Sequence, residues 1–133
     1  MRIIRSILLS VFVLLASIGI AQTTPDIPTV DVDHSYGTEC GFTHIVPAYR
    51  DSIEGIIKRK KFEDMDRWLL SDEDIKTVYA IEAFYRLKDE HKISDEQLQI
   101  IVHYKENDVS ITCCGRGIPE ECSSKEVLAS FEF

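Results

Sequence analysis

Beyond residue 21 the sequence has no apolar stretch long enough to cross a bilayer, which takes about 20 apolar residues. It also lacks a G-x-S-x-G elbow, a Walker loop, a G-x-G-x-x-G turn, an H-E-x-x-H pair and a C-x-x-C pair. These absences leave no motif for a hydrolase, a nucleotide-binding protein or a zinc enzyme. We therefore predict no cofactor and no metal, and we assign no catalytic residue.

Positive charge is scarce in most of the chain. Residues 1–21 hold two arginines and no acid, so residues 22–133 carry 13 basic and 23 acidic residues, a net charge of −10. Nucleic acid is excluded as a partner, because binding it depends on neutralising phosphates. Anionic membrane surfaces are excluded on the same electrostatic ground. The charge favours a basic protein partner, and it also keeps an exported protein soluble.

The N-terminus has the three parts of a secretory signal peptide. Arg2 and Arg5 precede an uncharged run rich in Ile, Leu, Val and Phe, and small residues, Gly19 and Ala21, flank the expected cleavage site. A retained membrane anchor is the alternative, but the run is short for a spanning helix. We predict that residues 1–21 are a cleaved signal peptide and that the protein is secreted or periplasmic.

The remaining chain divides at the end of a proline-containing segment. Pro25 and Pro28 disfavour a helix in residues 22–34, because each lacks an N–H and restricts the residue before it. We predict a flexible lead-in over 22–34 and a single small globular domain over 35–133. Ninety-nine residues suffice for one modest hydrophobic core.

Apolar spacing of three and four residues predicts a mainly α domain, a bundle of about three helices at 50–69, 72–90 and 94–106. The second helix is apolar nearly all round, which places it at the centre of the bundle. Because glycine is a poor helix former, a break near Gly55 within the first helix is the alternative prediction. Glu82 and Arg86, four residues apart on the polar strip of the second helix, are expected to pair with each other.

Local signals mark several boundaries. Ser71 is expected to cap the second helix, and Ser94 with Gln97 forms a capping box for the third. Because apolar residues also occur at every second position over 98–104, a strand is the competing prediction there. Further on we expect an extended segment at 109–112, a disulfide-linked loop at 113–122 and a short helix at 124–128.

The four cysteines predict a disulfide framework. A bridge between adjacent Cys113 and Cys114 would be strained, which leaves two pairings open. One joins Cys40 to Cys113 and Cys114 to Cys122; the other joins Cys40 to Cys114 and Cys113 to Cys122. Zinc binding and thiol redox chemistry are weaker alternatives, since the spacing does not fit either.

The segment 114–122, CGRGIPEEC, resembles the reactive loop of Bowman–Birk-type serine protease inhibitors. That resemblance places Arg116 at the specificity-determining position, followed by Gly117, Ile118 and Pro119. It implies a loop closed by a Cys114–Cys122 bridge and inhibition of a trypsin-like protease. Gly115 and Gly117 depart from the family, because two glycines loosen a loop that must be rigid.

The segment 68–87, WLLSDEDIKTVYAIEAFYRL, is similar to one unit of a HEAT-type helical repeat. The likeness lies in Leu-Leu at the end of one helix, an acidic turn, and apolar residues along the next helix. A solenoid needs about three or more such units. The resemblance therefore implies only a packed helix pair.

Three functions follow as hypotheses. The first is a non-catalytic exported module that binds another protein through its acidic helical surface. The second is protease inhibition through Arg116. The third is a weak metal-dependent function at Asp31, Asp33 and His34, a D-x-D-H cluster within the predicted lead-in.

Overall fold

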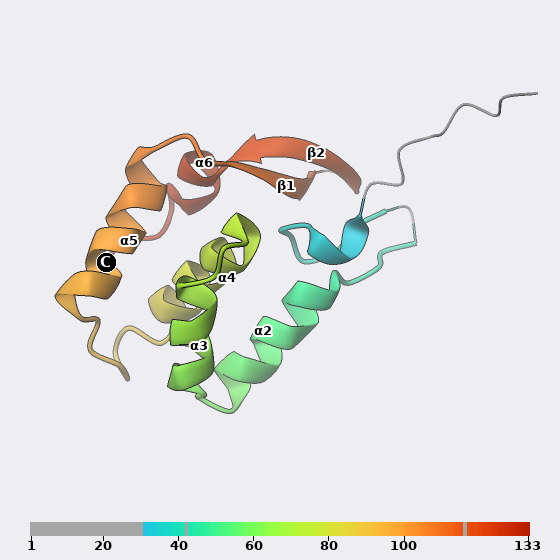
Figure 1. Cartoon of the computed structure of the whole chain (residues 1–133). Coiled ribbons are helices and arrows are strands. Elements are labelled where there is room, and N and C mark those ends of the chain that lie inside the picture. Colours follow the sequence, from blue (N-terminus) through green and yellow to red (C-terminus); the bar gives the residue numbers. More distant parts are fainter. Residues whose placement is uncertain (1–30, 42, 116) are drawn as a thin grey trace, which may run out of the picture.

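The computed structural model describes residues 31–41, 43–115 and 117–133. The predicted signal peptide and the lead-in up to residue 30 lie outside these residues, as do Phe42 and Arg116. Within the described part, no helix has the length and apolar character needed to cross a membrane. The elements in order are η1 (Val32–His34), α2 (Ala48–Lys58), α3 (Phe62–Leu69), α4 (Asp74–Arg86), α5 (Asp95–Glu106), β1 (Ser110–Gly115), β2 (Ile118–Ser123) and α6 (Ser124–Leu128) (Figure 1).

The domain is mainly helical, as predicted, but the three-helix bundle is wrong in detail. The described residues form five α-helices, the short 3-10 helix η1 and a two-stranded antiparallel sheet. The segment expected as one helix over 50–69 is two, α2 and α3. The break falls at Lys60, whose backbone is left-handed at φ 52°, and not at Gly55. The reversal lets the apolar faces of both helices pack on α4, which a straight helix would prevent.

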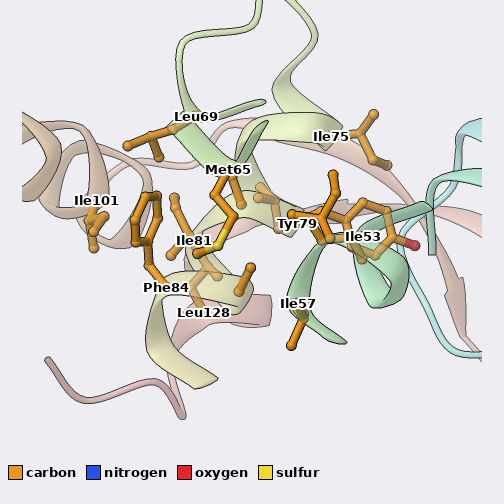
Figure 2. Close-up of a cluster of buried hydrophobic side chains, with 14 of the residues drawn as sticks. Ile53, Ile57, Met65, Leu69, Ile75, Tyr79, Ile81, Phe84, Ile101 and Leu128 are labelled. Atoms are coloured by element: carbon orange, nitrogen blue, oxygen red, sulfur yellow. The ribbon is translucent and has the colours of Figure 1, made fainter. Parts of the chain in front are cut away.

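Helix α4 is the centre of the fold, as its apolar circumference predicts. Ile75 and all residues from Thr77 to Phe84 are buried. Figure 2 shows the core around this helix, with labelled side chains that come from α2, α3, α4, α5 and α6. Helix α4 is shorter than the expected 72–90 at both ends, because its N-terminal cap is Glu73 and its C-terminal cap is Leu87. The Ser71 hydroxyl instead accepts a hydrogen bond from the Glu73 N–H at 3.1 Å.

The segment 113–122, expected as a loop, is most of a β-hairpin. Strands β1 and β2 are antiparallel, with Gly115 opposite Ile118 and Ser110 opposite Ser123. A two-residue connection of this kind favours glycine at positive φ, and Gly117 has φ +79°. The Gly41 N–H donates to the Gly117 carbonyl at 2.8 Å, so the hairpin tip is held by the preceding loop.

Two smaller predictions are confirmed. Ser94 accepts from the Gln97 N–H at 3.2 Å, and the Gln97 side chain accepts from the Ser94 N–H at 2.7 Å, so the capping box forms. Residues Asp95–Glu106 are therefore helical, and the competing strand is not formed. The short helix at 124–128 is also present as α6.

Replacing Ser94 by alanine is expected to lower the free energy of unfolding by about 1 kcal/mol, since α5 loses the side-chain acceptor of its cap. Urea denaturation followed by circular dichroism measures the change. Ser130→Ala is the matched control, because Ser130 is exposed. Equal losses in the two variants would show that the capping box contributes nothing measurable.

Candidate functional site

A cleft of about 560 Å³ lies between the hairpin, the start of α4 and η1. Glutamate and aspartate dominate its charged residues, and among the described residues no lysine or arginine lines it. We call it the acidic cleft. Its lining residues are His34, Glu73, Asp74, Ile75, Ser110, Ile111, Thr112, Pro119, Glu120 and Glu121.

Two elements supply the carboxylates of the acidic cleft. Glu73 and Asp74 stand at the N-terminal end of α4, where the helix dipole favours negative charge. Glu120 and Glu121 lie on β2. The hairpin reaches α4 through β1, whose Ile111 is buried in the core. This packing brings together two acidic pairs that are 46 residues apart in sequence.

Hydrogen bonds hold three of the four carboxylates in place. Glu73 accepts from the Tyr49 hydroxyl and pairs with Lys76. Asp74 accepts from the Tyr104 hydroxyl at 2.5 Å, and Glu121 accepts from the Ser110 hydroxyl at 2.6 Å. Glu120 is exposed, and its carboxylate makes no hydrogen bond or ion pair within the described part of the chain.

The pKa of Glu73 keeps this carboxylate of the acidic cleft ionised at neutral pH. Hydrogen bonds from Lys76 and Tyr49 lower the pKa of Glu73 below its ordinary value. Burial, followed by the hydrogen bond to Asp74, raises the pKa of Tyr104 to about 12, so its hydroxyl remains a donor. Fixed carboxylates on two walls suit the binding of cationic side chains.

A buried ion pair anchors the chain segment beside this site. Arg50 donates to both oxygens of Glu82, at 2.7 and 2.8 Å, and both residues are less than 10% exposed. The predicted Glu82–Arg86 pair is therefore only secondary, at 3.5 Å. Arg86 instead binds Glu54 of α2. Glu82 pairs with Arg50 because Arg50, in the first turn of α2, lies on the side of α4 that carries Glu82.

Three further contacts connect this ion pair to residues 35–37. The Tyr36 hydroxyl donates to Glu82 at 2.6 Å, and the Arg50 Nε donates to the Gly37 carbonyl at 2.9 Å. The Tyr79 hydroxyl donates to the Ser35 carbonyl at 2.8 Å. Tyr36 in turn bonds to β1 through its backbone. The network thus holds the edge of the hairpin against the helices.

The structure decides between the two disulfide pairings. Cys40 is bridged to Cys114 and Cys113 to Cys122, with Cα–Cα distances of 5.3 and 5.9 Å. None of the four cysteines is free. Disulfides are consistent with an extracellular location.

The inhibitor-like segment has a different ring from the one that the resemblance implies. Its nine-residue loop requires a Cys114–Cys122 bridge, whereas here Cys122 is bridged to Cys113. Gly117 forms a turn, and Ile118 and Pro119 begin β2. Arg116 lies outside the described residues. Inhibition of a trypsin-like protease therefore stays a prediction from the sequence.

The D-x-D-H cluster is brought together only in part. His34 lies in η1 and its ring contacts the Asp31 carboxylate, and His34 also borders the acidic cleft. Asp33 does not line the cleft. Over residues 31–41, 43–115 and 117–133, no group of three or more His, Cys, Asp or Glu side chains is placed to hold a metal ion.

Comparison with known proteins gives no relative from which a function could be transferred. No protein-family model matches the chain, and no curated protein or solved structure matches it significantly. Residues 68–87 do form the end of α3, a turn and α4. Their similarity to a HEAT-type unit stays a prediction.

The carboxylates of the acidic cleft are the functional candidates that the sequence interpretation missed. Glu73 and Asp74 read as part of a helix-capping turn, and Glu120 and Glu121 as part of a loop. Each pair is a run of adjacent acids, which was the only local signal available. Nothing in the sequence indicated that the two runs face one cleft.

Proposed function

We propose that this protein is an exported, non-catalytic module that binds a basic region of a partner protein in the acidic cleft. The observation that carries the proposal is the set of four acidic residues, from α4 and β2, that line one cleft, with no lysine or arginine among its described lining residues. Export is supported by the two disulfides and by the signal-like sequence of residues 1–21.

The wider charge of the protein favours the same class of partner. Residues 22–133 carry a net charge of −10, which attracts a basic protein at long range and speeds encounter. The attraction weakens with salt, because the Debye length falls to about 8 Å at physiological ionic strength. We therefore expect the association rate to fall as salt is added.

The acidic cleft also offers apolar surface beneath its charges. Ile75, Ile111 and Pro119 are among the lining residues. Lysine and arginine carry apolar stems below their charged groups and bury them against such surface. A basic side chain would thus contact both the carboxylates and the apolar floor.

Charge reversal in the acidic cleft is expected to weaken binding of a cationic peptide at least tenfold. The probe is an acetylated, amidated lysine–valine peptide with the repeat Val-Val-Lys-Lys, and the variant is Glu120→Lys with Glu121→Lys. Both positions are exposed, so the fold should survive. Isothermal titration calorimetry at low and physiological salt measures the affinity.

The control variant changes the net charge equally at a distant place. Glu63→Lys with Asp89→Lys alters two exposed acids near the C-terminal end of α4, whereas the cleft is at its N-terminal end. This variant should keep most of the affinity. If both double variants lose affinity equally, the attraction is general and the cleft is not the site. If the wild type does not bind, the proposed function is wrong for basic partners.

A further inference from the structure

Among the residues that the structure describes, strand β2 has a free edge. The sheet that they form contains two strands, and within it β2 pairs only with β1. The isolated bridges of the described residues, Tyr36 with Cys113 and Cys40 with Ile45, do not involve β2. An unpaired edge is a template for another strand.

The register shows which backbone groups of β2 point outward. The Tyr36 N–H donates to the Thr112 carbonyl at 2.7 Å, and the Cys114 N–H donates to the Tyr36 carbonyl at 2.8 Å. Thr112 and Cys114 therefore direct their backbone groups away from β2. In an antiparallel pair, the residues opposite them also face away from β1. These are Glu121 and Pro119.

We propose that the β2 edge takes an extended basic segment of the partner as a third strand. This inference rests on the proposed function and specifies how the partner binds. The Glu121 N–H and C=O and the Pro119 C=O would bond to the backbone of the added strand. Strand addition of this kind gives affinity through the main chain and specificity through alternate side chains.

The charges along β2 decide the kind of occupant. If two molecules of this protein paired through their β2 edges, Glu120 and Glu121 of one molecule would lie opposite the same two glutamates of the other. Like charges opposite each other across a strand pair are destabilising. Pro119 removes one donor and further discourages self-pairing. A basic strand would instead place positive charges opposite these carboxylates. The β2 edge therefore favours a basic strand over a second copy of this protein.

The side chains of β2 also suggest a pattern in the partner. Ile118 and Glu120 share one face of the strand because side chains alternate. Ile118 is 56% exposed, so it offers apolar surface two residues from a carboxylate. Cross-strand pairing then favours an apolar and a basic residue two positions apart in the partner.

Acidic groups continue on the other side of the edge. A second hollow of about 360 Å³ shares Ser110 and Glu121 with the acidic cleft. It also contains Asp108 and Glu126. An added strand on β2 would therefore lie between carboxylates over much of its length.

Two disulfides constrain this edge before any partner binds. The Cys113–Cys122 bridge links the two strands of the hairpin, and the Cys40–Cys114 bridge links β1 to the preceding loop. Little conformational entropy would be lost from this side on binding.

A backbone-modified probe tests the inference. The lysine–valine peptide is compared with a copy that is N-methylated at every residue, which keeps each charge and side chain but donates no N–H. We expect the N-methylated copy to bind at least tenfold more weakly. Equal affinity would overturn strand addition while leaving the acidic cleft as a charge site. Failure of both peptides would overturn the proposed function itself.

A pair of variants tests the edge from the protein side. Glu121→Pro removes the outward N–H without removing a backbone hydrogen bond between β1 and β2. Glu121→Ala is the matched control, because it loses the same carboxylate and the same hydrogen bond from Ser110 but keeps the N–H. We expect the proline variant to bind the unmodified peptide several-fold more weakly than the alanine variant. Equal affinities, with thermal unfolding showing that both variants are folded, would contradict strand addition.

Discussion

Arg50→Ala is expected to lower the free energy of unfolding by about 3–5 kcal/mol, the cost of leaving one member of a buried ion pair without its partner. Arg50 is 7% exposed and Glu82 is 8% exposed, and two short hydrogen bonds join them. The substitution also removes the donor to the Gly37 carbonyl. Urea denaturation monitored by tryptophan fluorescence measures the loss.

Arg86→Ala is the matched control for this prediction. Arg86 pairs with Glu54 on the surface, where the side chains are 40% and 43% exposed. Exposed pairs contribute about 0–1 kcal/mol, so this variant should lose little. Comparable losses in the two variants would mean that the buried Arg50–Glu82 pair contributes no more to the free energy of unfolding than an exposed pair.

The Arg50–Glu82 pair also makes the stability of the protein depend on pH in the acid range. Burial raises the pKa of Glu82, but hydrogen bonds from Arg50 and Tyr36 outweigh it, and the folded pKa lies below the ordinary value of 4.5. A carboxyl group with a lowered folded pKa stabilises the protein above its unfolded pKa, and that stability is lost as pH falls through the folded value. Without Arg50, burial would raise the pKa of Glu82 above its unfolded value, so this carboxyl group would destabilise the variant at neutral pH, and its contribution to stability would improve as the pH falls. Urea denaturation of the wild type and Arg50→Ala from pH 7 to pH 3 measures this difference.

Removing the Cys40–Cys114 bridge is expected to cost more than removing the Cys113–Cys122 bridge. The bridged cysteines are 74 and 9 residues apart. Loop-closure entropy assigns about 4.5 kcal/mol to the longer loop and about 2.7 kcal/mol to the shorter one. Cys40 is also fully buried, so truncation there adds a packing loss.

Paired alanine variants separate the two bridges. Cys40→Ala with Cys114→Ala is compared with Cys113→Ala with Cys122→Ala, so that no free thiol remains in the broken pair. Denaturant unfolding under non-reducing conditions gives both stabilities. A larger loss from the short bridge would show that the hairpin, and not the chain closure at Cys40, limits the stability of the domain.

Local signals predicted several elements correctly. The Ser94–Gln97 capping box placed the start of α5 within one residue, and the apolar circumference of α4 placed it at the centre. Both signals involve residues within a few positions of one another, so no distant contact is needed to interpret them. The short helix α6 was predicted on the same basis.

The misses arose where distant segments decide the outcome. The break at Lys60 depends on how α2 and α3 both reach α4. The hairpin was missed because Gly117 and Pro119 read as loop residues, whereas a two-residue turn and pairing with β1 make them part of a strand pair. The Arg50–Glu82 pair was missed because the nearer Arg86 offered a helix-spaced partner.

By itself the sequence determined the helical class, the central place of α4, the acidic charge and a disulfide framework. Composition and short-range periodicity set these properties whatever the chain path. Only the tertiary structure decided the cysteine partners, the buried ion pair and the acidic cleft. Each requires residues from separate elements to meet, and packing of the hairpin and α2 against α4 is what brings Glu73 near Glu121 and Arg50 near Glu82.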